Sequence, residues 1–309
     1  MKQNIVIVAG PTASGKTAIG IEIAEMFDGE IVSADSMQIY KKLNINTAKA
    51  TLDEQSKVKH HLIDIVEPDE EFSVTDFVEK ATAAINDIVS RKKLPVIVGG
   101  TGMYIKSLLY PQSFGNSVKD EKIREKYEKF VCDYGPEALH KLLKEVDPES
   151  AKEIHPNNVK RVIRALEIFD TTGVPKSQQK DDITESIYNP IFIVLDVPRE
   201  KLYQRINRRV DLMIDSGGVE EARFVYDHLN LKPNAQCLQA IGYKEFLPYL
   251  QGTKLLLDAK EDLAQATRHY AKRQLTYFRS FKDAKWFNPL TQKQEIISYI
   301  KERLENDNQ

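Results

Sequence analysis

The chain has 309 residues, which is enough for one large domain or for a domain that carries a sizeable insertion. Hydrophobic residues make up 41% of the chain and charged residues 29%, a balance that excludes an intrinsically disordered protein. The 44 Lys and Arg residues nearly balance the 46 Asp and Glu residues, giving a formal net charge of -2. This argues against a uniformly basic protein that coats nucleic acid, but it does not exclude local basic patches.

The longest apolar runs, at 5–9 and 191–195, are too short to span a bilayer, so we expect no membrane segment. A strand is predicted almost at the N-terminus, which leaves no room for a signal or transit peptide. The two cysteines, Cys132 and Cys237, form no Cys-x-x-Cys pair, which excludes a disulfide framework and a zinc finger. These features predict a protein of the reducing cytoplasm.

Short apolar runs are the predicted core strands, and they lie at 5–9, 30–34, 61–66, 95–98 and 190–197. Helix-length stretches, such as 16–27 and 75–91, lie between several of them. Alternating strands and helices are typical of a parallel sheet with helices on both faces. The sequence therefore predicts an α/β fold with a doubly wound parallel sheet.

This alternation stops after Tyr110. Between 119 and 179 no run resembles a strand, and helical patterns rich in charged residues fill the segment. The run at 190–197 then restores the core, and mostly helical patterns follow it. We therefore predict an inserted all-helical domain at 116–187 within an α/β core formed by 1–115 and 188–309.

A phosphate-loop pattern follows the first predicted strand and opens the first predicted helix. Its residues are Gly10, Pro11, Thr12, Ala13, Ser14, Gly15, Lys16 and Thr17. The glycines let the backbone wrap tightly, so that successive amides and the positive helix end point at one anion. Lys16 adds a full charge, and the Thr17 hydroxyl is suited to hold Mg²⁺. The pattern predicts polyphosphate binding in a P-loop NTPase-like fold, but it does not distinguish phosphate transfer from diphosphate release.

Asp35 follows the second predicted strand. Ligands of open parallel sheets bind beyond the carboxyl ends of the strands, so we expect Asp35 close to the phosphate loop. Its carboxylate could bind Mg²⁺ through water or accept a proton from an attacking nucleophile. The alternative is a structural cap, in which Asp35 or Ser36 accepts hydrogen bonds from free backbone amides.

Two adjacent glycines, Gly99 and Gly100, end a further predicted strand. Glycines at a strand end permit close approach to the backbone, which here is plausible for a ligand. A plain tight turn explains the same pair equally well.

Three stretches concentrate positive charge, at 155–169, 199–209 and 268–285. The first presents basic residues at helical spacing opposite an apolar side: Lys160, Arg161 and Arg164. The third interleaves basic residues with Tyr270, Tyr277, Phe278 and Phe281. Basic helices with aromatic residues suit RNA, whose phosphates they grip and whose unpaired bases they stack. The alternatives are solvated helix faces and, for the arginines after the phosphate loop, a lid that closes on phosphates.

The combination of these motifs resembles one family, the tRNA dimethylallyltransferases, or bacterial tRNA isopentenyltransferases. The matching segments run in order along nearly the whole chain: GPTASGKT from Gly10, DSMQIY from Asp35, NTAKA from Asn46, HHLID from His60, VGGTGMY from Val98, HPNNVKRVIRALEI from His155, QAIGYKE from Gln239 and TRHYAKRQLTYFR from Thr267. The phosphate loop alone is generic, whereas DSMQIY, GGTGMY and AKRQLTYFR are specific.

The resemblance implies transfer of a dimethylallyl group from its diphosphate to N6 of adenosine 37, beside the anticodon of tRNA. The phosphate loop, Thr12 to Thr17 above all, would hold the leaving diphosphate together with Mg²⁺, and Asp35 would be the general base. Lys16, Thr17 and an arginine, either Arg205 or Arg209, would neutralise the diphosphate as it departs.

The resemblance also implies which residues contact tRNA. Asp35, Ser36, Met37 and Gln38 would contact the target adenosine, and Thr101 would lie beside it after the base leaves its stack. The anticodon stem-loop would be bound by Arg124, Lys160, Arg161, Arg164, Gly242, Tyr243, Lys244, Arg268, Lys272 and Arg273. The bacterial type is favoured because no zinc finger follows the core. Family members usually act as monomers, so a monomer is expected.

Other functions share parts of this pattern. A small-molecule or nucleotide kinase would use the same phosphate loop and arginine lid, with Asp35 accepting a hydroxyl proton. An enzyme that prenylates free adenine nucleotides would need less RNA surface. A non-catalytic RNA-binding ATPase would not need Asp35 as a base.

Overall fold

The computed structural model describes residues 2–110, 120–179 and 185–306. They belong to two compact units, one formed by Met1–Leu109 with Ser186–Gln309 and the other by Tyr110–Glu185. The expected start of the insertion, at 116, lies outside the described residues. Its expected end, at 187, lies just past the end of the second unit.

The first unit is built on a sheet of six parallel strands in the order β3-β2-β4-β1-β5-β6. Their bounds are β1 Asn4–Ala9, β2 Gly29–Ser33, β3 His60–His61, β4 Leu94–Gly99, β5 Asn189–Leu195 and β6 Lys285–Phe287. The central strand β1 is apolar throughout its buried part, and Val6 lies opposite Val96 of β4 and Ile191 of β5. The predicted parallel sheet is confirmed.

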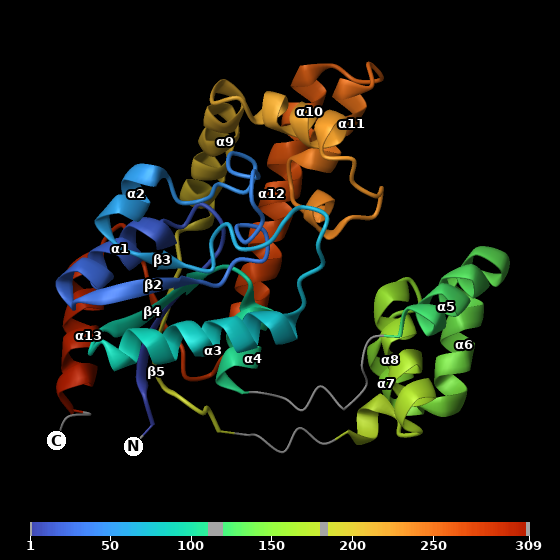
Figure 1. The fold of residues 1–309 in the computed structure, drawn as a ribbon, viewed down its shortest axis with the longest axis horizontal. Helices are drawn as coiled ribbons and strands as arrows, with labels where there is room; N and C mark the ends of the chain where they lie inside the picture. The colour runs from blue at the N-terminus through green and yellow to red at the C-terminus, as the bar shows by residue number, and fades with distance from the viewer. Residues whose placement is uncertain (1, 111–119, 180–184, 307–309) are drawn as a thin grey trace. The chain divides into compact units, whose positions relative to one another are not determined.

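Helices cover both faces of this sheet, as the doubly wound prediction requires (Figure 1). Helices α1 (Lys16–Met26) and α13 (Lys293–Asn306) share one core with alternate residues of the strands. Helices α3 (Val74–Ser90) and α4 (Gly102–Leu109) lie on the other side. The remaining helices of the unit are α2 Leu52–Lys57, α9 Arg199–Asp215, α10 Gly218–His228, η2 Gln236–Gln239, α11 Tyr243–Leu250 and α12 Leu256–Phe278.

The predicted strands differ from the structure most clearly at two points. The strand expected at 61–66 is only His60–His61, because Leu62 and Asp64 take φ angles of 62° and 55°, outside the extended region. The short edge strand β6 was not predicted, since three residues carry no usable alternation.

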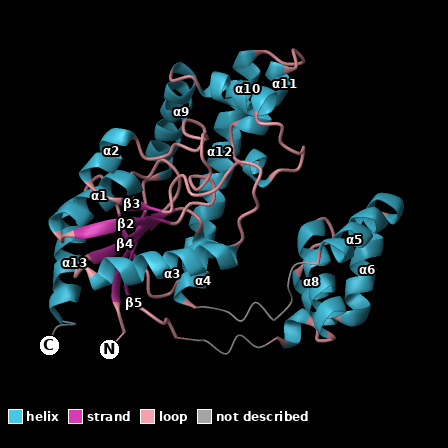
Figure 2. Cartoon of the chain, viewed as in Figure 1, coloured by secondary structure: helices cyan, strands magenta, loops and turns pink. Residues whose placement is uncertain are grey.

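The described part of the second unit consists of helices and the loops that connect them (Figure 2). Its elements are α5 Glu121–Tyr134, α6 Pro136–Val146, α7 Pro148–Glu153, α8 Val159–Thr172 and the 3₁₀ turn η1 Lys176–Gln178. Their apolar faces pack around Tyr127, Leu139, Leu143, Val162 and Leu166. A helical unit interrupting the α/β chain is therefore present.

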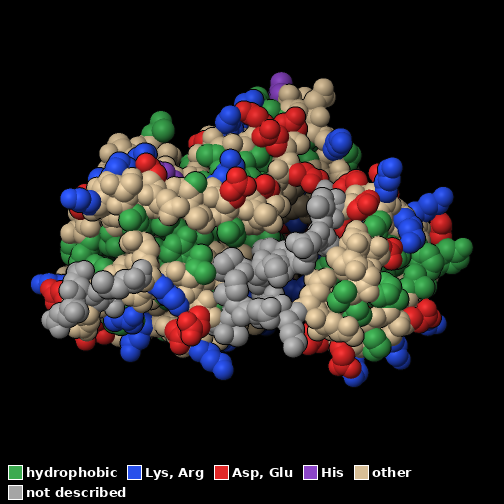
Figure 3. Space-filling model, turned by 60° about the horizontal axis from the view of Figure 1, so that its bottom comes forward, with side chains coloured by type: hydrophobic (Ala, Val, Ile, Leu, Met, Phe, Trp, Pro, Cys, Tyr) green, Lys and Arg blue, Asp and Glu red, His purple; other side chains and the backbone are tan. Residues whose placement is uncertain are grey.

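The surface shows both signs of charge interspersed on the face seen in Figure 3, in keeping with the nearly neutral composition. Within the described residues, no helix has both the length and the apolarity needed to cross a bilayer.

A buried carboxylate, Glu30, ties β2 to its surroundings far from the carboxyl end of the sheet. Only 4% of Glu30 is exposed, and both its oxygens bind the guanidinium of Arg91, while Oε2 also lies 2.8 Å from Nε2 of His61. The Arg91 hydrogen bonds, aided by His61, lower the pKa of Glu30 to about 2 despite its burial. The ionised form therefore stabilises the fold.

We predict that Glu30→Gln lowers the free energy of unfolding at pH 7 by about 2 kcal/mol, because the hydrogen bonds from Arg91 and His61 lose their charged, buried acceptor. The pKa of Glu30 is lowered on folding, so its contribution is complete above about pH 4.5 and disappears as the pH falls towards 2. Denaturant unfolding at several pH values should show the two proteins converge in acid. Asp87→Asn is the control, since Asp87 also binds Arg91 but is exposed, and it should cost less than about 1 kcal/mol.

Candidate active site

A pocket of about 270 Å³ opens at the carboxyl ends of β1, β2 and β4. Lys16 and Thr17 reach it from the start of α1, and Asp35 reaches it from the segment that follows β2. Helix α9 contributes Arg209, and α12 contributes Arg273. The parallel sheet thus brings the predicted phosphate-binding and acid–base residues into one pocket, as expected for the ends of parallel strands.

The phosphate loop makes the turn between β1 and α1. Gly10 and Gly15 take φ angles of 151° and 95°, and Gly15 caps the N-terminus of α1 in the left-handed region. Nζ of Lys16 donates a 2.7 Å hydrogen bond to the carbonyl oxygen of Pro11, so the ammonium lies folded over the loop. The helix N-terminus and Lys16 together make this end of the pocket positive.

Two arginines of α9 lie beside the phosphate loop. A Cβ built on Gly15 would lie 3.3 Å from Nη2 of Arg205, which places Arg205 against the loop. Arg209 lines the main pocket, and both arginines line a smaller opening together with Ala13 and Thr17. Of the two candidates for the leaving group, Arg209 therefore lies nearer to Asp35 and the rest of the pocket.

The pocket holds more positive than negative charge. Burial lowers the pKa of Lys16 to about 7, opposed by the attraction of Asp35 and reinforced by repulsion from Arg209. Burial also lowers the pKa of Arg209, and Asp35 again opposes the shift. A carboxylate and two partly buried cations interact here, an arrangement that favours a multiply charged anion as ligand.

Asp35 fills the capping role, and its geometry is compatible with the second role that the sequence left open. Its Oδ1 accepts hydrogen bonds from the backbone amides of Met37, at 2.9 Å, and Gln38, at 3.3 Å, so it caps the turn after β2. Among the described residues no group donates to Oδ2, and Asp35 lines the pocket. One oxygen therefore fixes the side chain while the other is available for a proton.

Thr101 joins the ends of β2 and β4 next to Asp35. Its Oγ1 accepts a 3.1 Å hydrogen bond from the backbone amide of Ser36. Tyr270 of α12 lines the same pocket, and burial raises the pKa of its phenol, which keeps the hydroxyl protonated. Ser36, Met37 and Gln38 line the pocket, whereas Thr101 acts on it through Ser36.

The glycine pair after β4 serves close packing of the protein on itself. A Cβ on Gly99 would lie 2.1 Å from the carbonyl oxygen of Ala34, and one on Gly100 would lie 2.2 Å from Nε2 of Gln274. Close approach was predicted, but the groups that approach are protein groups, because β2 and α12 occupy the space.

Gln274 was not singled out from the sequence, although it lies in the AKRQLTYFR segment. Its Oε1 accepts a 2.8 Å hydrogen bond from the amide of Thr12, and its Nε2 donates a 3.0 Å bond to the carbonyl oxygen of Gly100. The residue is 6% exposed. Helix α12 is thereby fastened to the phosphate loop and to the end of β4.

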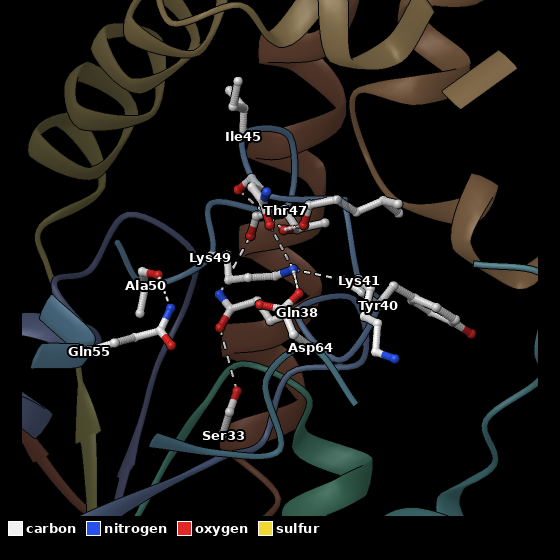
Figure 4. A network of polar contacts seen from close by, with 12 residues as sticks. Ser33, Gln38, Tyr40, Lys41, Ile45, Thr47, Lys49, Ala50, Gln55 and Asp64 are labelled. Carbon is white, nitrogen blue, oxygen red and sulfur yellow. Dashed lines mark hydrogen bonds and ion pairs between the residues drawn. The ribbon is translucent and has the colours of Figure 1, made fainter. Parts of the chain in front are cut away.

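The segment 38–49 forms a further wall, and a buried ammonium holds it in place (Figure 4). Nζ of Lys49 donates to the carbonyl oxygen of Tyr40, to Oδ1 of Asn44 and to Oδ1 of Asp64. Burial lowers the pKa of Lys49, while the hydrogen bond to Asp64 opposes this shift. Gln38 contributes a 3.1 Å hydrogen bond from Nε2 to the carbonyl oxygen of Ala48.

The residues predicted to contact tRNA in the first unit fall into different environments. Lys272 and Arg273 are exposed on α12, and Lys244 is exposed beside the pocket. Arg268 is paired with Asn207 and Glu261. Tyr243 is a correction: its side chain is fully buried and its hydroxyl donates to Glu221, so it offers no surface to RNA. Gly242 is also buried, against Asn46.

In the helical unit, two of the four predicted contacts are engaged with a buried acid. Arg124 and Arg164 both bind the carboxylate of Glu167, which is fully buried. Lys160 and Arg161 are exposed on α8, and in the described part of the chain no acidic side chain pairs with either. The same helix thus carries structural and free positive charges.

Oxygen donors suitable for a hard cation lie beside the phosphate loop. Thr17 and Asp35 line the same pocket and offer a hydroxyl and a carboxylate. Mg²⁺ prefers oxygen ligands and usually keeps several waters alongside one or two protein groups and substrate phosphates. The donor set therefore fits Mg²⁺. No group of three or more His, Cys, Asp or Glu side chains suited to a metal is found within the described ranges.

Comparisons with known proteins agree with this geometry. The family model for IPP transferase matches residues 38–281. The chain is 47% identical to the tRNA dimethylallyltransferase of Bacillus pumilus, covering 98% of this chain and 97% of the relative. It is 48% identical to that of Bacillus licheniformis, covering 98% of both.

Solved structures give the same result. The full-length tRNA isopentenylpyrophosphate transferase of Bacillus halodurans superposes with a TM-score of 0.72 at 41% identity, covering 100% of both chains. A eukaryotic dimethylallyltransferase acting on tRNA superposes with a TM-score of 0.78 at 31% identity, covering 93% of this chain and 74% of that one. The chain with this phosphate loop, carboxylate and inserted helical unit therefore belongs to the IPP transferase family.

Proposed function

We propose that this protein is a tRNA dimethylallyltransferase, which moves the dimethylallyl group of dimethylallyl diphosphate to N6 of adenosine 37 in tRNA. The observation that carries the proposal is the pocket that unites Lys16 and Arg209 with the carboxylate of Asp35. Cations at one end suit a diphosphate leaving group, and a carboxylate with one free oxygen suits an attacking amine. The relatives named for this reaction extend over nearly the whole chain.

The reaction is a substitution at the first carbon of the prenyl group. The N6 amine attacks that carbon, a C–N bond forms, and the C–O bond to the diphosphate breaks with its electron pair leaving on oxygen. The proton lost from N6 passes to Asp35, whose position is fixed by the amides of Met37 and Gln38. Lys16, the N-terminus of α1, and Arg209 neutralise the charge that develops on the diphosphate.

Mg²⁺ fits beside this leaving group. Thr17 would hold the ion, with Asp35 close enough to share its water ligands. When bound, the ion supplies additional positive charge to the diphosphate oxygens.

The acceptor is a base within a folded RNA, so the adenosine must leave its stack to enter the pocket. We assign the anticodon stem-loop to the exposed cations of α12 and of the helical unit, which offer charge for phosphates. We place the protein in the cytoplasm, in keeping with its two free cysteines, and expect a monomer because the family resemblance implies one.

A kinase remains chemically conceivable from the phosphate loop alone, but the comparisons do not favour it. The relatives are named tRNA dimethylallyltransferase, and the solved structure from Bacillus halodurans is named tRNA isopentenylpyrophosphate transferase.

We expect Asp35→Asn to lower the rate of prenyl transfer by about 10³-fold, because the amide can still cap the turn but cannot accept the N6 proton. Mass analysis of nucleosides from tRNA incubated with dimethylallyl diphosphate and Mg²⁺ would measure the product. Asp196→Asn, an exposed acid at the end of β5, is the control and should react normally. Full activity of Asp35→Asn would show that another group takes the proton.

Binding of dimethylallyl diphosphate should take up about one proton at pH 8.5, because the anion raises the pKa of Lys16 from its lowered value of about 7. Since the ammonium is already charged below pH 7, the affinity should fall as the pH rises above 7. Calorimetry in two buffers of different ionisation enthalpy measures the uptake. Lys16→Met should abolish the proton uptake. Uptake that persists in this variant would show that a group other than Lys16 takes up the proton.

Free and paired cations of the helical unit should respond differently to removal. Lys160→Ala with Arg161→Ala should weaken tRNA binding about tenfold and reduce its salt dependence, without lowering the unfolding temperature. Arg124→Ala should instead lower the free energy of unfolding by about 2 kcal/mol, because Glu167 loses a charged partner while buried. Filter binding measures the tRNA affinity, and thermal unfolding measures the stability. Normal tRNA affinity in the double variant would show that Lys160 and Arg161 do not contact tRNA.

A further inference from the structure

Glu221, in the first turn of α10, accepts an unusual number of hydrogen bonds. Its Oε2 accepts from the backbone amides of Asn44, at 2.7 Å, and Ile45, at 2.8 Å. Its Oε1 accepts from the backbone amide of Asn46 at 2.9 Å, from Nδ2 of Asn46 at 3.2 Å and from the Tyr243 hydroxyl at 2.9 Å. Three consecutive amides converge on one carboxylate, and the five donors exceed its roughly four lone-pair sites, so the three donors at Oε1 share that oxygen.

The groups that Glu221 joins belong to two separate walls of the active-site pocket. Asn46, Thr47 and Ala48 form part of one wall. Ile241 and Lys244 form part of another, on either side of the buried Tyr243. Glu221 itself is not among the residues that line the pocket. One carboxylate behind the pocket therefore fixes the distance between two walls that are remote in sequence.

Close packing reinforces this junction. Nδ2 of Asn46 donates a 2.8 Å hydrogen bond to the carbonyl oxygen of Gly218. Gly242 has a φ of 117°, and a Cβ there would lie 2.8 Å from Oδ1 of Asn46. The two walls are in contact at Gly242, where no side chain fits between them. They therefore cannot move closer together to compensate for the loss of the Glu221 hydrogen bonds.

The opposite side of the same segment is fixed by a second set of hydrogen bonds. Lys49 binds Tyr40, Asn44 and Asp64, and Gln38 binds the carbonyl oxygen of Ala48 (Figure 4). The segment is thus held at both sides, by an ammonium that binds oxygens and by a carboxylate that binds amides. The phosphate loop has no hydrogen bond to Glu221 in the described part of the chain.

From this geometry we infer that Glu221 is a positioning residue for the acceptor adenosine, and that it acts through the walls at 44–48 and 241–244 without touching substrate. The inference rests on the proposed prenyl transfer to tRNA. Loss of the carboxylate leaves three amides without an acceptor and loosens the acceptor side of the pocket. The diphosphate side, held by α1, Gln274 and Lys16, keeps its structure.

The test compares Glu221→Gln with Glu220→Gln, which removes the exposed neighbouring acid of the same helix turn. Glutamine keeps the size of Glu221 but presents an NH₂ group to amide donors. We expect kcat/KM for tRNA to fall by about tenfold to a hundredfold, while the Kd for dimethylallyl diphosphate changes less than about twofold. Glu220→Gln should match the wild type in both.

Amide hydrogen exchange provides a readout that does not depend on turnover. Peptides covering 44–46 should exchange faster in Glu221→Gln, and those covering the phosphate loop should not. Equal losses of diphosphate and tRNA binding would indicate general collapse of the pocket and overturn the inference, as would normal kinetics. A wild-type protein that binds the diphosphate but modifies no tRNA would instead overturn the proposed function.

Discussion

Uncompensated positive charge is the constraint on which this active site depends. Lys16 and Arg209 are crowded into a pocket where burial lowers the pKa of both groups and Asp35 is their common anionic neighbour. Such an arrangement is costly for the empty protein and is relieved by a ligand carrying several negative charges. The surrounding structure keeps these cations together. The phosphate loop that follows β1 positions Lys16, and helix α9 positions Arg209.

The other half of the site is arranged to keep the carboxylate of Asp35 close to that positive charge. Asp35 is restrained by backbone amides, and the walls around it are fastened from behind by Lys49, Gln274 and Glu221. Gln274 and Glu221 bond mainly to backbone groups, whereas Lys49 bonds to one backbone carbonyl and to the side chains of Asn44 and Asp64. Rigid support of this kind is what orientation of two substrates requires.

Local patterns predicted that the phosphate loop and Asp35 lie close together, and the structure places both at one pocket, because these patterns depend on near neighbours in sequence. The phosphate loop needs only a strand before it and a helix after it, and Asp35 needs only its place at a strand end. The supporting residues could not be found in this way. The backbone partners of Glu221 and Gln274 lie more than a hundred residues away. The shortness of β3 depends on the left-handed backbone at Leu62 and Asp64. Arg161 and Arg164 look alike in the helical pattern, and only the buried Glu167 distinguishes them.

The sheet topology also constrains the order in which the molecule can assemble during synthesis. The central strand β1 pairs with β4 on one side but with β5 on the other, so that Asn4 lies opposite Asn189. The second edge of β1 therefore stays open until the whole helical unit has left the ribosome. That unit is held by contacts between helices that are near in sequence, and such local contacts form quickly. While the helical unit is being synthesised, the nascent chain thus exposes one unpaired edge of the apolar strand β1. Chaperones can bind this exposed strand during that time.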